Sequence, residues 1–366
     1  MKVVIPRIEL VALIGKIQAI VPSKPAIPIL GNILIEAIDD QLILSATDLT
    51  VSMRAFTKVK IEKEGAITLP AKKFFQLIRE LTAPQIEIDC TTSETAYINA
   101  GTSHFKMSGM NKSEFPTLPD LSEGVHLNFD NTTLKEMLMR SSFSAARDDN
   151  RQVLNGILLQ SLKKTATFVG TDGKRLARLF TSVDIPEAHT ASYILPLKAV
   201  EEIVKLLDSK EQTCKLALMS DKIAIESGSI ILISKLLSGQ YPDVARVIPQ
   251  KAETPIIIHR EEMMSLLRQI SLFTSEMSSA VRFTFVSGEL HLSAMSGDIG
   301  EGKVTMPVNY GGPKLDVAFN PHYFIDILRH TKDETVQLTL IDAYNPGLVT
   351  DSTNAQFVIM PMRLET

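Results

Sequence analysis

Hydrophobic and polar positions recur in three long segments of similar length. In each segment an apolar run reaches a short polar or glycine-containing turn and continues as a second apolar run, which predicts a β-hairpin. The matching stretches are residues 31–48, 155–172 and 280–297, at offsets of 124 and 125 residues. A pattern that keeps one spacing along the whole chain predicts tandem copies of one folding unit.

Predicted helices recur in step with these hairpins. Pro70, Pro196 and Pro321 each begin a stretch with apolar residues at helical spacing, and proline is well tolerated in the first turn of a helix. A further amphipathic stripe begins each copy, starting near Leu10, Leu134 and Met263. Two helices and several short strands in each copy predict an α+β fold of three tandem domains, at residues 1–122, 123–250 and 251–366.

The hexapeptide Thr171–Leu176 follows the middle hairpin and has two interpretations. Asp-Gly after a strand-like run favours a turn, because glycine tolerates positive φ. In the aligned copies, Thr47-Asp48 and Ser296-Gly297 end matching strands but lack the Gly-Lys-Arg-Leu continuation. We therefore expect the turn to be architectural in every copy and the continuation to be specialised in the middle one.

Composition is that of an ordinary globular protein, with 45% hydrophobic and 22% charged residues among 366. No apolar run approaches the roughly 18 residues of a membrane-spanning helix, and the N-terminus has no signal-peptide pattern. Cys90 and Cys214 are far apart and lack metal-ligand spacing, so we expect reduced, buried thiols in a cytoplasmic protein.

Charge is distributed unevenly along the chain. The predicted helices together carry +4, and since the whole chain carries −4, the remainder carries −8. A solvated helix surface explains this small excess equally well. It is also the balance expected of a protein whose helices face phosphates, which would be bound without sequence preference.

Catalytic and metal-binding patterns are not found. No two histidines stand at i,i+4, no phosphate-binding loop or G-x-S-x-G elbow is present, and neither a cofactor nor a metal site is predicted. An enzyme with a site around Asp172 and Lys174 stays open as an alternative, although no paired nucleophile or base accompanies them.

Short motifs distributed over the whole chain resemble the bacterial sliding clamp family, the β subunit of DNA polymerase III. They are PILGN (Pro28–Asn32), ATDL (Ala46–Leu49), PAKKFF (Pro70–Phe75), LNGILL (Leu154–Leu159), TDGKRLA (Thr171–Ala177), SKLLSGQYPD (Ser234–Asp243) and MPMRL (Met360–Leu364). Each is weak alone, but they occur in the family's order and spacing.

This resemblance implies a non-enzymatic processivity factor. A head-to-tail homodimer of clamp domains would form a ring around double-stranded DNA, with helices lining the hole. The implied partners are the polymerase III α subunit, the clamp loader, and other polymerases and repair proteins; no membrane partner is implied. A specialised paralogue serving another polymerase or protecting against a clamp-directed inhibitor is the alternative within the family.

The resemblance also implies three groups of site residues. A cleft that accepts short apolar peptides of partners would comprise Leu154, Thr171, Gly173, Lys174, Arg175, Leu176, Pro242, Arg246, Val247, Val358, Met360, Pro361 and Met362. DNA-facing residues would be Lys24, Lys73, Arg79, Arg147, Arg151 and Lys198. The dimer interface would use Phe105 against Leu272 and Phe273.

Departures from the family pattern concern partner preference and DNA contact. Lys174 replaces a histidine often found there, and Gln152 and Val153 stand where aromatic residues are common. Two residues, Glu365 and Thr366, extend the chain beyond the usual terminal leucine and place extra carboxylates beside the cleft.

Overall fold

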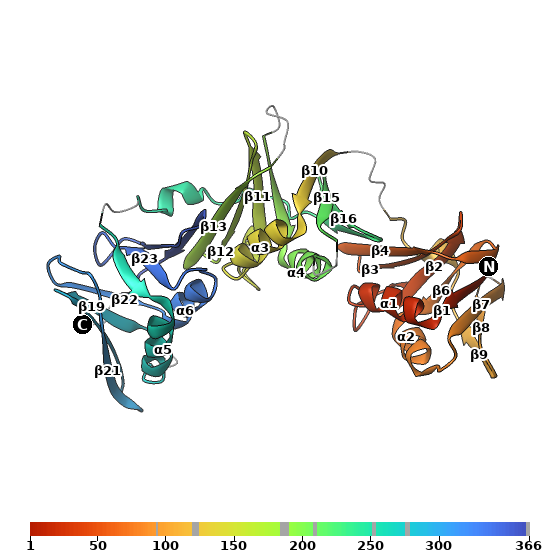
Figure 1. The fold of residues 1–366 in the computed structure, drawn as a ribbon, viewed down its shortest axis with the longest axis horizontal. Coiled ribbons are helices and arrows are strands. Elements are labelled where there is room, and N and C mark those ends of the chain that lie inside the picture. Colours follow the sequence, from red (N-terminus) through yellow and green to blue (C-terminus); the bar gives the residue numbers. More distant parts are fainter. Residues whose placement is uncertain are drawn as a thin grey trace. The chain divides into compact units, whose positions relative to one another are not determined.

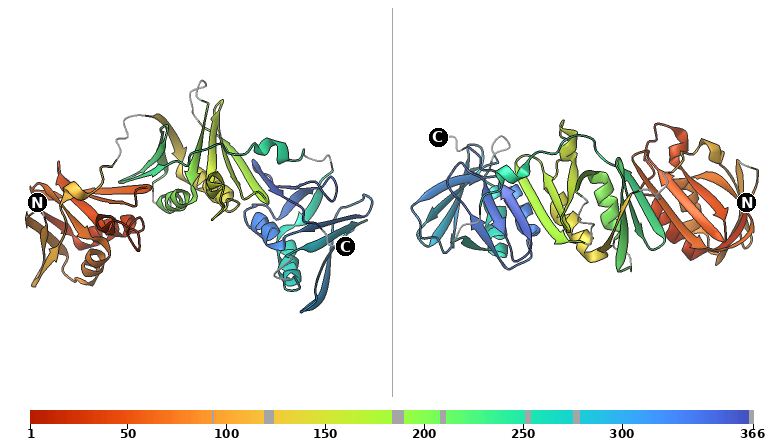
Figure 2. Two further views of the ribbon diagram at one scale, coloured as in Figure 1. Left: turned by 180° about the vertical axis from the view of Figure 1, so that it is seen from behind. Right: turned by 90° about the horizontal axis from the view of Figure 1, so that it is seen from above.

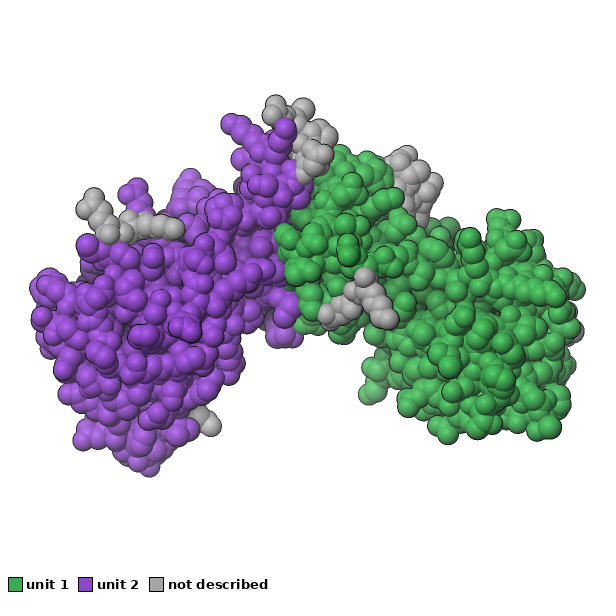
Figure 3. Space-filling model, viewed as in Figure 1, with its two compact units in different colours: residues 1–135, 198–236 green, residues 136–197, 237–366 purple. Residues whose placement is uncertain are grey.

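The computed structural model describes residues 1–92, 94–118, 124–183, 190–207, 211–250, 254–274 and 279–363. The chain divides into two compact units, coloured separately in Figure 3. The first unit contains residues 1–135 and 198–236, and the second contains residues 136–197 and 237–366. The middle repeat therefore contributes to both units, and the domain limits expected at 122/123 and 250/251 stay predictions.

The first unit holds two antiparallel sheets with helices packed on them. Its eight-stranded sheet has the order β10 (Val125–Asp130), β15 (Thr213–Leu218), β16 (Lys222–Ser227), β17 (Ile230–Lys235), β4 (Val51–Lys58), β3 (Gln41–Thr47), β2 (Asn32–Ile38) and β6 (Gly65–Pro70). Its five-stranded sheet has the order β5 (Lys60–Lys63), β1 (Lys2–Pro6), β7 (Gln85–Thr92), β8 (Thr95–Ala100) and β9 (Ser103–Ser108). Its helices are α1 (Arg7–Ile17), α2 (Ala71–Glu80), α4 (Leu197–Leu206), η1 (Pro28–Gly31) and η2 (Lys112–Glu114).

The second unit repeats this architecture. Its eight-stranded sheet has the order β14 (Ala191–Pro196), β11 (Gly156–Leu162), β12 (Thr165–Thr171), β13 (Arg175–Ser182), β25 (Ala355–Ile359), β24 (Gly347–Thr350), β23 (Thr335–Thr339) and β18 (Ile256–His259). Its four-stranded sheet has the order β21 (Gly300–Pro307), β20 (Glu289–Ser296), β19 (Val281–Val286) and β22 (Leu315–Phe319). Its helices are α3 (Asn131–Ser142), which begins in the first unit and continues into the second, α5 (Arg260–Ser271), α6 (Pro321–Arg329), η3 (Gln152–Asn155) and η4 (Val244–Val247).

Amphipathic spacing explains how the helices pack. The predicted stripe of α1 is confirmed, because Leu10, Leu13, Ile14 and Ile17 are all buried. In the first unit α1 packs against α2, and in the second α5 packs against α6 (Figures 1 and 2). These helices and the antiparallel sheets confirm the predicted α+β class.

Each eight-stranded sheet contains one seam where strands of successive repeats pair. In the first unit β4 pairs with β17, and Met53 lies opposite Leu232. In the second unit β13 pairs with β25 in the same register, and Ala177 lies opposite Phe357. The fourth strand of one repeat thus joins the last strand of the next repeat.

The hairpins correct the alignment of the third repeat by one residue. Asp39-Asp40 and Lys163-Lys164 form tight turns with positive φ at both positions, as in type I′ turns. The third turn lies at residues 287–288, between Val286 and Glu289, so its offset from the second is 124. The expected equivalence of Ser296 with Thr171 is therefore wrong, because Met295 occupies that position.

Candidate functional site

The Thr171–Leu176 turn is held by its own side chains. Thr171 Oγ1 donates to the carbonyl of Arg175 at 2.6 Å and accepts from the N–H of Gly173 at 3.0 Å. Asp172 Oδ1 accepts from the N–H groups of Lys174 and Arg175 at 2.9 and 3.0 Å. Gly173 has a φ of +84°, the left-handed conformation expected for this glycine.

The first repeat builds the same turn from different residues. Thr47 Oγ1 donates to the carbonyl of Val51 and accepts from the N–H of Leu49, while Asp48 Oδ1 accepts from the N–H groups of Thr50 and Val51. Leu49 takes the position of Gly173 with a φ of +74°. The prediction that the turn is architectural is thus confirmed for these two copies.

Arg175 is the side chain that the middle copy adds to this turn. Its Nε contacts Asp172 Oδ2 at 3.2 Å, and its Nη1 donates to Asp326 Oδ2 on α6 at 2.6 Å. Its guanidinium carbon lies 4.6 Å from the ring centroid of Tyr323 and 5.5 Å from that of Phe143. Two carboxylates and two aromatic rings therefore fix Arg175 in place.

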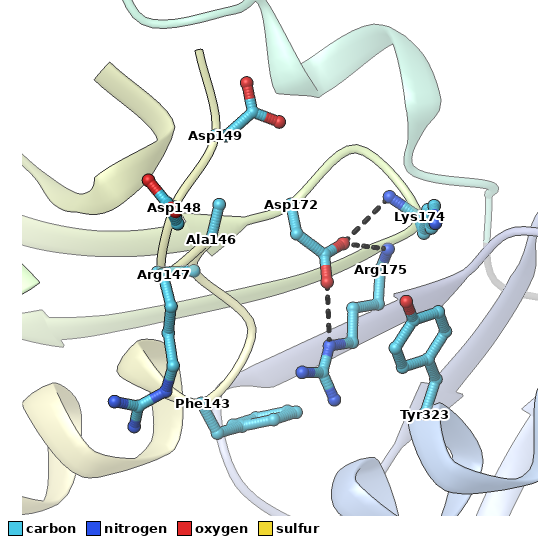
Figure 4. A pocket seen from close by; sticks show the side chains of 10 residues that line it. Phe143, Ala146, Arg147, Asp148, Asp149, Asp172, Lys174, Arg175 and Tyr323 are labelled. Atoms are coloured by element: carbon cyan, nitrogen blue, oxygen red, sulfur yellow. Dashed lines mark hydrogen bonds and ion pairs between the residues drawn. The ribbon is translucent and has the colours of Figure 1, made fainter. Parts of the chain in front are cut away.

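A cavity of about 340 Å³ lies beside Arg175 (Figure 4). Its lining combines the turn with the 145–149 segment and with Tyr323 of α6. Lys174 and Arg175, predicted for the partner cleft, share this cavity with Arg147, predicted to face DNA. In Figure 4 the Arg147 side chain extends away from Asp172.

Two of the acidic residues that line this cavity, Asp149 and Asp172, are engaged by neighbouring groups. Asp149 forms a two-point ion pair with Arg151, at 3.0 Å and 2.9 Å, which lowers the pKa of Asp149 to about 2 and raises the pKa of Arg151. Asp172 accepts from Arg175 and from two backbone N–H groups. Neither carboxylate is arranged as a general base, so the geometry does not favour the enzyme alternative.

An apolar cluster lies behind the predicted cleft. Leu154, Leu176 and Val358 are buried together, from η3, β13 and β25 respectively. Residues of the 237–248 segment pack against the same cluster. Because these three residues lie in the core, we expect them to shape the floor of a cleft.

Tyr241 extends this cluster under the 239–245 segment. Its hydroxyl donates to the carbonyl of Val169 at 3.3 Å, and burial raises the pKa of the phenol. A second cavity, of about 440 Å³, lies between this segment and strands β11 to β14, and Pro242 is one of its lining residues. Open space with a mixed polar and apolar lining is therefore available beside the 239–245 segment.

The other members of the predicted cleft include more exposed residues, which we expect to form a rim around this floor. Met360 donates its N–H to the carbonyl of Lys174 at 2.9 Å, and Met362 donates to the carbonyl of Ala318 at 2.8 Å. Val247 is 40% exposed and Met360 is 36% exposed, and Pro242 and Arg246 are also exposed. Pro361 lies between the two methionines, while Glu365 and Thr366 lie outside the described residues.

Sequence reasoning missed the groups that hold the cleft residues in position. Phe143, Tyr323 and Asp326 were not singled out, yet each contacts Arg175. A signal was present for Tyr323, which follows by two residues the proline that begins its predicted helix. The sequence alone does not show which strand this helix covers.

The residues predicted to face DNA have different surroundings. Lys198 is ion-paired with Asp48 in the first unit. Burial alone would raise the pKa of Asp48, but the bonds from Lys198 and the backbone lower it overall. Lys24 and Lys73 are exposed, and Arg79 lies 5.6 Å from the Phe75 ring centroid.

The predicted interface residues belong to different units, Phe105 to the first and Leu272 and Phe273 to the second. Phe105 on edge strand β9 is 38% exposed and Leu272, after α5, is 70% exposed. Phe273 lies against Gly302 of edge strand β21, where a Cβ would come within 2.9 Å of its ring. Both predicted surfaces thus lie at sheet edges.

The two cysteines match the prediction of buried thiols. Cys90 and Cys214 are buried free thiols, and burial raises the pKa of each to about 11. Within the described residues, no cluster of three histidine, cysteine, aspartate or glutamate side chains is arranged to hold a metal ion. No helix in that part of the chain is long and apolar enough to span a membrane.

Comparisons with known proteins give one consistent family. The chain matches models of the DNA polymerase III beta subunit for its N-terminal domain at residues 1–119, its central domain at 128–243 and its C-terminal domain at 245–363. A protein named beta sliding clamp from Chlamydia muridarum is 48% identical over 364 residues, covering 100% of this chain and 99% of the relative. The Escherichia coli K12 protein of that name is 31% identical over 377 residues and covers 100% of both chains.

Solved structures agree with this similarity. The DNA polymerase sliding clamp from Pseudomonas aeruginosa has a TM-score of 0.95 at 28% identity, and both chains are fully covered. The sliding clamp from Bacillus subtilis has a TM-score of 0.94 at 25% identity, again over 100% of both chains.

Proposed function

Because the chain belongs to the DNA polymerase III beta subunit family, we propose that it is a DNA sliding clamp that confers processivity on the replicative polymerase. The protein is then a non-catalytic accessory subunit acting on chromosomal DNA in the cytoplasm. It would encircle double-stranded DNA without sequence preference and hold polymerase at the template. Topological retention needs little binding energy, which fits a chain with only modest excess positive charge on its helices.

This proposal rests on two sheet edges that lack the partner strand expected from the repeat. Strands β4 and β13 pair with β17 and β25, the last strands of the following repeats. The next strand in this series is β21, and the last strand of the first repeat is β9; each is an edge of its own sheet. We infer that β21 of one copy pairs with β9 of a second copy, closing a head-to-tail dimer.

The register of this intermolecular seam follows from the two seams inside the chain. Gly302 lies opposite Ala294 in its hairpin, as Ala177 lies opposite Gly170 and Met53 opposite Ala46. Across the sheets, Phe105 lies opposite Ile98, as Leu232 lies opposite Ile225 and Phe357 opposite Val349.

Phe105 of one copy should therefore lie opposite Gly302 of the other. Gly302 already lies against Ile270 and Phe273, so Phe105 would meet Phe273 there, beside the exposed Leu272 that directly follows α5. This agrees with the three residues predicted for the interface. An aromatic contact beneath a paired strand is a stable arrangement for a permanent ring.

We assign DNA contact to the basic residues on the helical side of the units. On α2 the buried residues are Ala71, Phe74 and Ile78, while Lys73 and Arg79 are exposed. The other members of this set are Lys24, Arg147, Arg151 and Lys198. Since Arg151 and Lys198 already pair with carboxylates, their attraction to phosphate would be weakened, which favours sliding over tight binding.

We assign partner binding to the floor and rim formed by the turn, the 242–247 segment and the 358–362 segment. Partners would be the polymerase α subunit, the clamp loader, and other polymerases and repair proteins, each inserting a short apolar segment. The buried leucines and valine supply an apolar floor, and Met360 and Met362 supply adaptable side chains at the rim.

Retention on circular DNA tests the clamp proposal. After loading by a clamp loader, the protein should remain on nicked circular DNA through gel filtration and should leave when a restriction enzyme linearises the circle. Escape requires a free DNA end, so blocking both ends of the linear product with bound protein should restore retention. Equal retention on circular and open linear DNA would rule out an encircling ring.

A further inference from the structure

A cavity of about 340 Å³ in the first unit lies between α1 and α4, beside the β4–β17 seam. Its volume is within the range of small-molecule sites, about 300–1,000 Å³. The lining is mainly apolar and includes Ala19, Met53, Leu206 and Ile230. None of the residues assigned above to DNA, partner peptide or dimer contacts lines this cavity.

The second unit fills the corresponding space with aromatic rings. There Phe143, after α3, stacks on His330, after α6, with ring centroids 4.0 Å apart and planes 8° apart. Phe357 of the β13–β25 seam lies 5.9 Å from Phe143. Three rings therefore occupy the space between the helices and the seam.

Comparison of equivalent positions in the repeats explains why the first unit has a cavity here. The helix that contains Leu10 matches the one that contains Leu134 at an offset of 124, so Ala19 corresponds to Phe143. From Pro196 to Pro321 the offset is 125, so Lys205 corresponds to His330. In the seam register Leu232 corresponds to Phe357. Three smaller or non-aromatic side chains thus replace three rings.

The charged side chains at this cavity leave one positive group unneutralised. Lys205 contacts Glu202 at 2.7 Å, so this pair balances itself. Lys16 corresponds to Arg140, which in the second unit pairs with Asp351 and Glu136. Within the described part of the chain no ion pair or hydrogen bond is found for the exposed Lys16 side chain.

We propose that this cavity binds a small aromatic molecule carrying a negative charge. Its ring would take the space that Phe143 and His330 occupy in the other unit, against Met53 and Ile230. Its anionic group would reach Lys16 at the open side. An uncharged ring would bind less tightly because it gains only the apolar contacts.

Binding of 2-naphthoate to the full chain, without DNA, tests the proposal by isothermal titration or ligand-observed NMR. The chain has no tryptophan, so naphthyl fluorescence provides a further readout. Ala19→Phe supplies the ring that the second unit carries and should weaken binding by roughly tenfold or more. Lys16→Gln should weaken naphthoate binding roughly two- to fivefold and leave binding of neutral 2-naphthylmethanol unchanged.

Ala12→Phe is the matched control, because it adds the same ring at an exposed position of α1 outside the cavity lining. It should bind naphthoate as the wild type does. Unchanged affinity in folded Ala19→Phe, or no naphthoate binding by the wild type at millimolar concentration, would overturn the proposal. Lys16→Gln retains the wild-type packing, so it tests the charge even where Ala19→Phe fails to fold.

Discussion

Arg140 and Asp351 form the most completely buried ion pair described in the second unit. Arg140 Nη2 donates to Asp351 Oδ2 at 2.6 Å, and the other guanidinium nitrogens donate to Glu136, Thr353 and the carbonyl of His330. The Asp351 side chain has 0% exposure. A pair enclosed in this way is destabilising to break, because the remaining charge has no water around it.

We predict that Asp351→Asn lowers the free energy of unfolding by about 3 kcal/mol, since it leaves the Arg140 guanidinium buried without its carboxylate. Urea denaturation followed by circular dichroism measures this. Asp243→Asn removes an exposed pair with Arg246 and should change stability by less than about 1 kcal/mol. Arg140→Met combined with Asp351→Asn should cost less than the sum of the single changes, and additive costs would contradict this account.

His330 makes the stability of the second unit depend on pH. Burial is the main reason that its pKa lies below the ordinary value of 6.5, and the charges of Arg140 and Arg175 act in the same direction. The unfolded chain therefore binds a proton at higher pH than the folded chain does. Stability from the neutral ring is complete above about pH 6.5 and is lost as pH falls toward the folded-state pKa.

We predict that His330→Phe reduces the loss of stability between pH 7 and pH 5, because phenylalanine keeps the stack on Phe143 but takes up no proton. Urea midpoints at several pH values measure the difference. His330→Phe also removes the hydrogen bond to the Asp326 carbonyl, which changes stability at every pH. The loss of stability at lower pH is therefore measured relative to the variant's own stability at pH 7. His322→Phe, at an exposed position of α6, should keep the wild-type slope. The same slope in His330→Phe would show that other groups cause it.

The sequence indicated the residues of the 171–176 turn but not the residues that support it. Thr171, Asp172 and Gly173 were recognised because their hydrogen bonds are local and turn chemistry is visible in a short peptide. The contact of Arg175 with Tyr323 joins residues about 150 positions apart, and no local pattern encodes it. The sequence motifs that resemble the family supplied the cleft positions without showing what fixes them.

At the scale of elements, periodicity predicted the helices and hairpins, and the turns limited the accuracy. The stripe of α1 was right because burial at i, i+3, i+4 and i+7 follows from helix geometry. The third hairpin was misaligned by one residue because an ungapped comparison cannot detect the longer connection between β20 and β21, where Ser296 pairs with Gly300. The pairing of strands across the seams depends on long-range contacts, which the hydrophobic pattern of the sequence does not encode.

The proposed cleft combines the 171–176 turn with the 242–247 and 358–362 segments, and its proposed rim can be tested separately from its floor. Val247 of η4 is 40% exposed, so Val247→Asp should leave folding intact while placing a carboxylate beside the apolar floor. We predict that binding of an apolar clamp-binding peptide from a bacterial polymerase weakens by roughly tenfold or more. Fluorescence anisotropy with a labelled peptide measures the affinity.

Leu162→Asp is the control for Val247→Asp, because Leu162 is a similarly exposed aliphatic residue at the end of β11, beside the 163–164 turn and outside the predicted cleft. Its affinity for the peptide should equal that of the wild type. If both variants lose affinity, the effect is one of added negative charge; if neither does, the rim has been misplaced. Unchanged mass in sedimentation would show that either variant keeps its oligomeric state.

At the scale of the whole molecule, one pairing rule accounts for both observed seams and predicts a third. The same register, with Met53 opposite Leu232 and Ala177 opposite Phe357, applied to the free edges sets Lys106 of one copy opposite Glu301 of the other. Both side chains are exposed within one chain. Opposite charges facing each other across paired strands are favourable, and like charges are unfavourable.

We predict that Lys106→Glu weakens the dimer, because it would place two carboxylates opposite each other at both seams of the ring. Its dissociation constant should rise roughly tenfold, and Glu301→Lys should act similarly. The double variant should recover near wild-type affinity, which sedimentation at decreasing concentration measures. Lys60→Glu, with the same charge change on β5 at the other edge of the same sheet, should leave the dimer unchanged. Only the proposed register makes residues 106 and 301 interact, so a double variant no tighter than the singles would show that the strands pair in another register or do not pair.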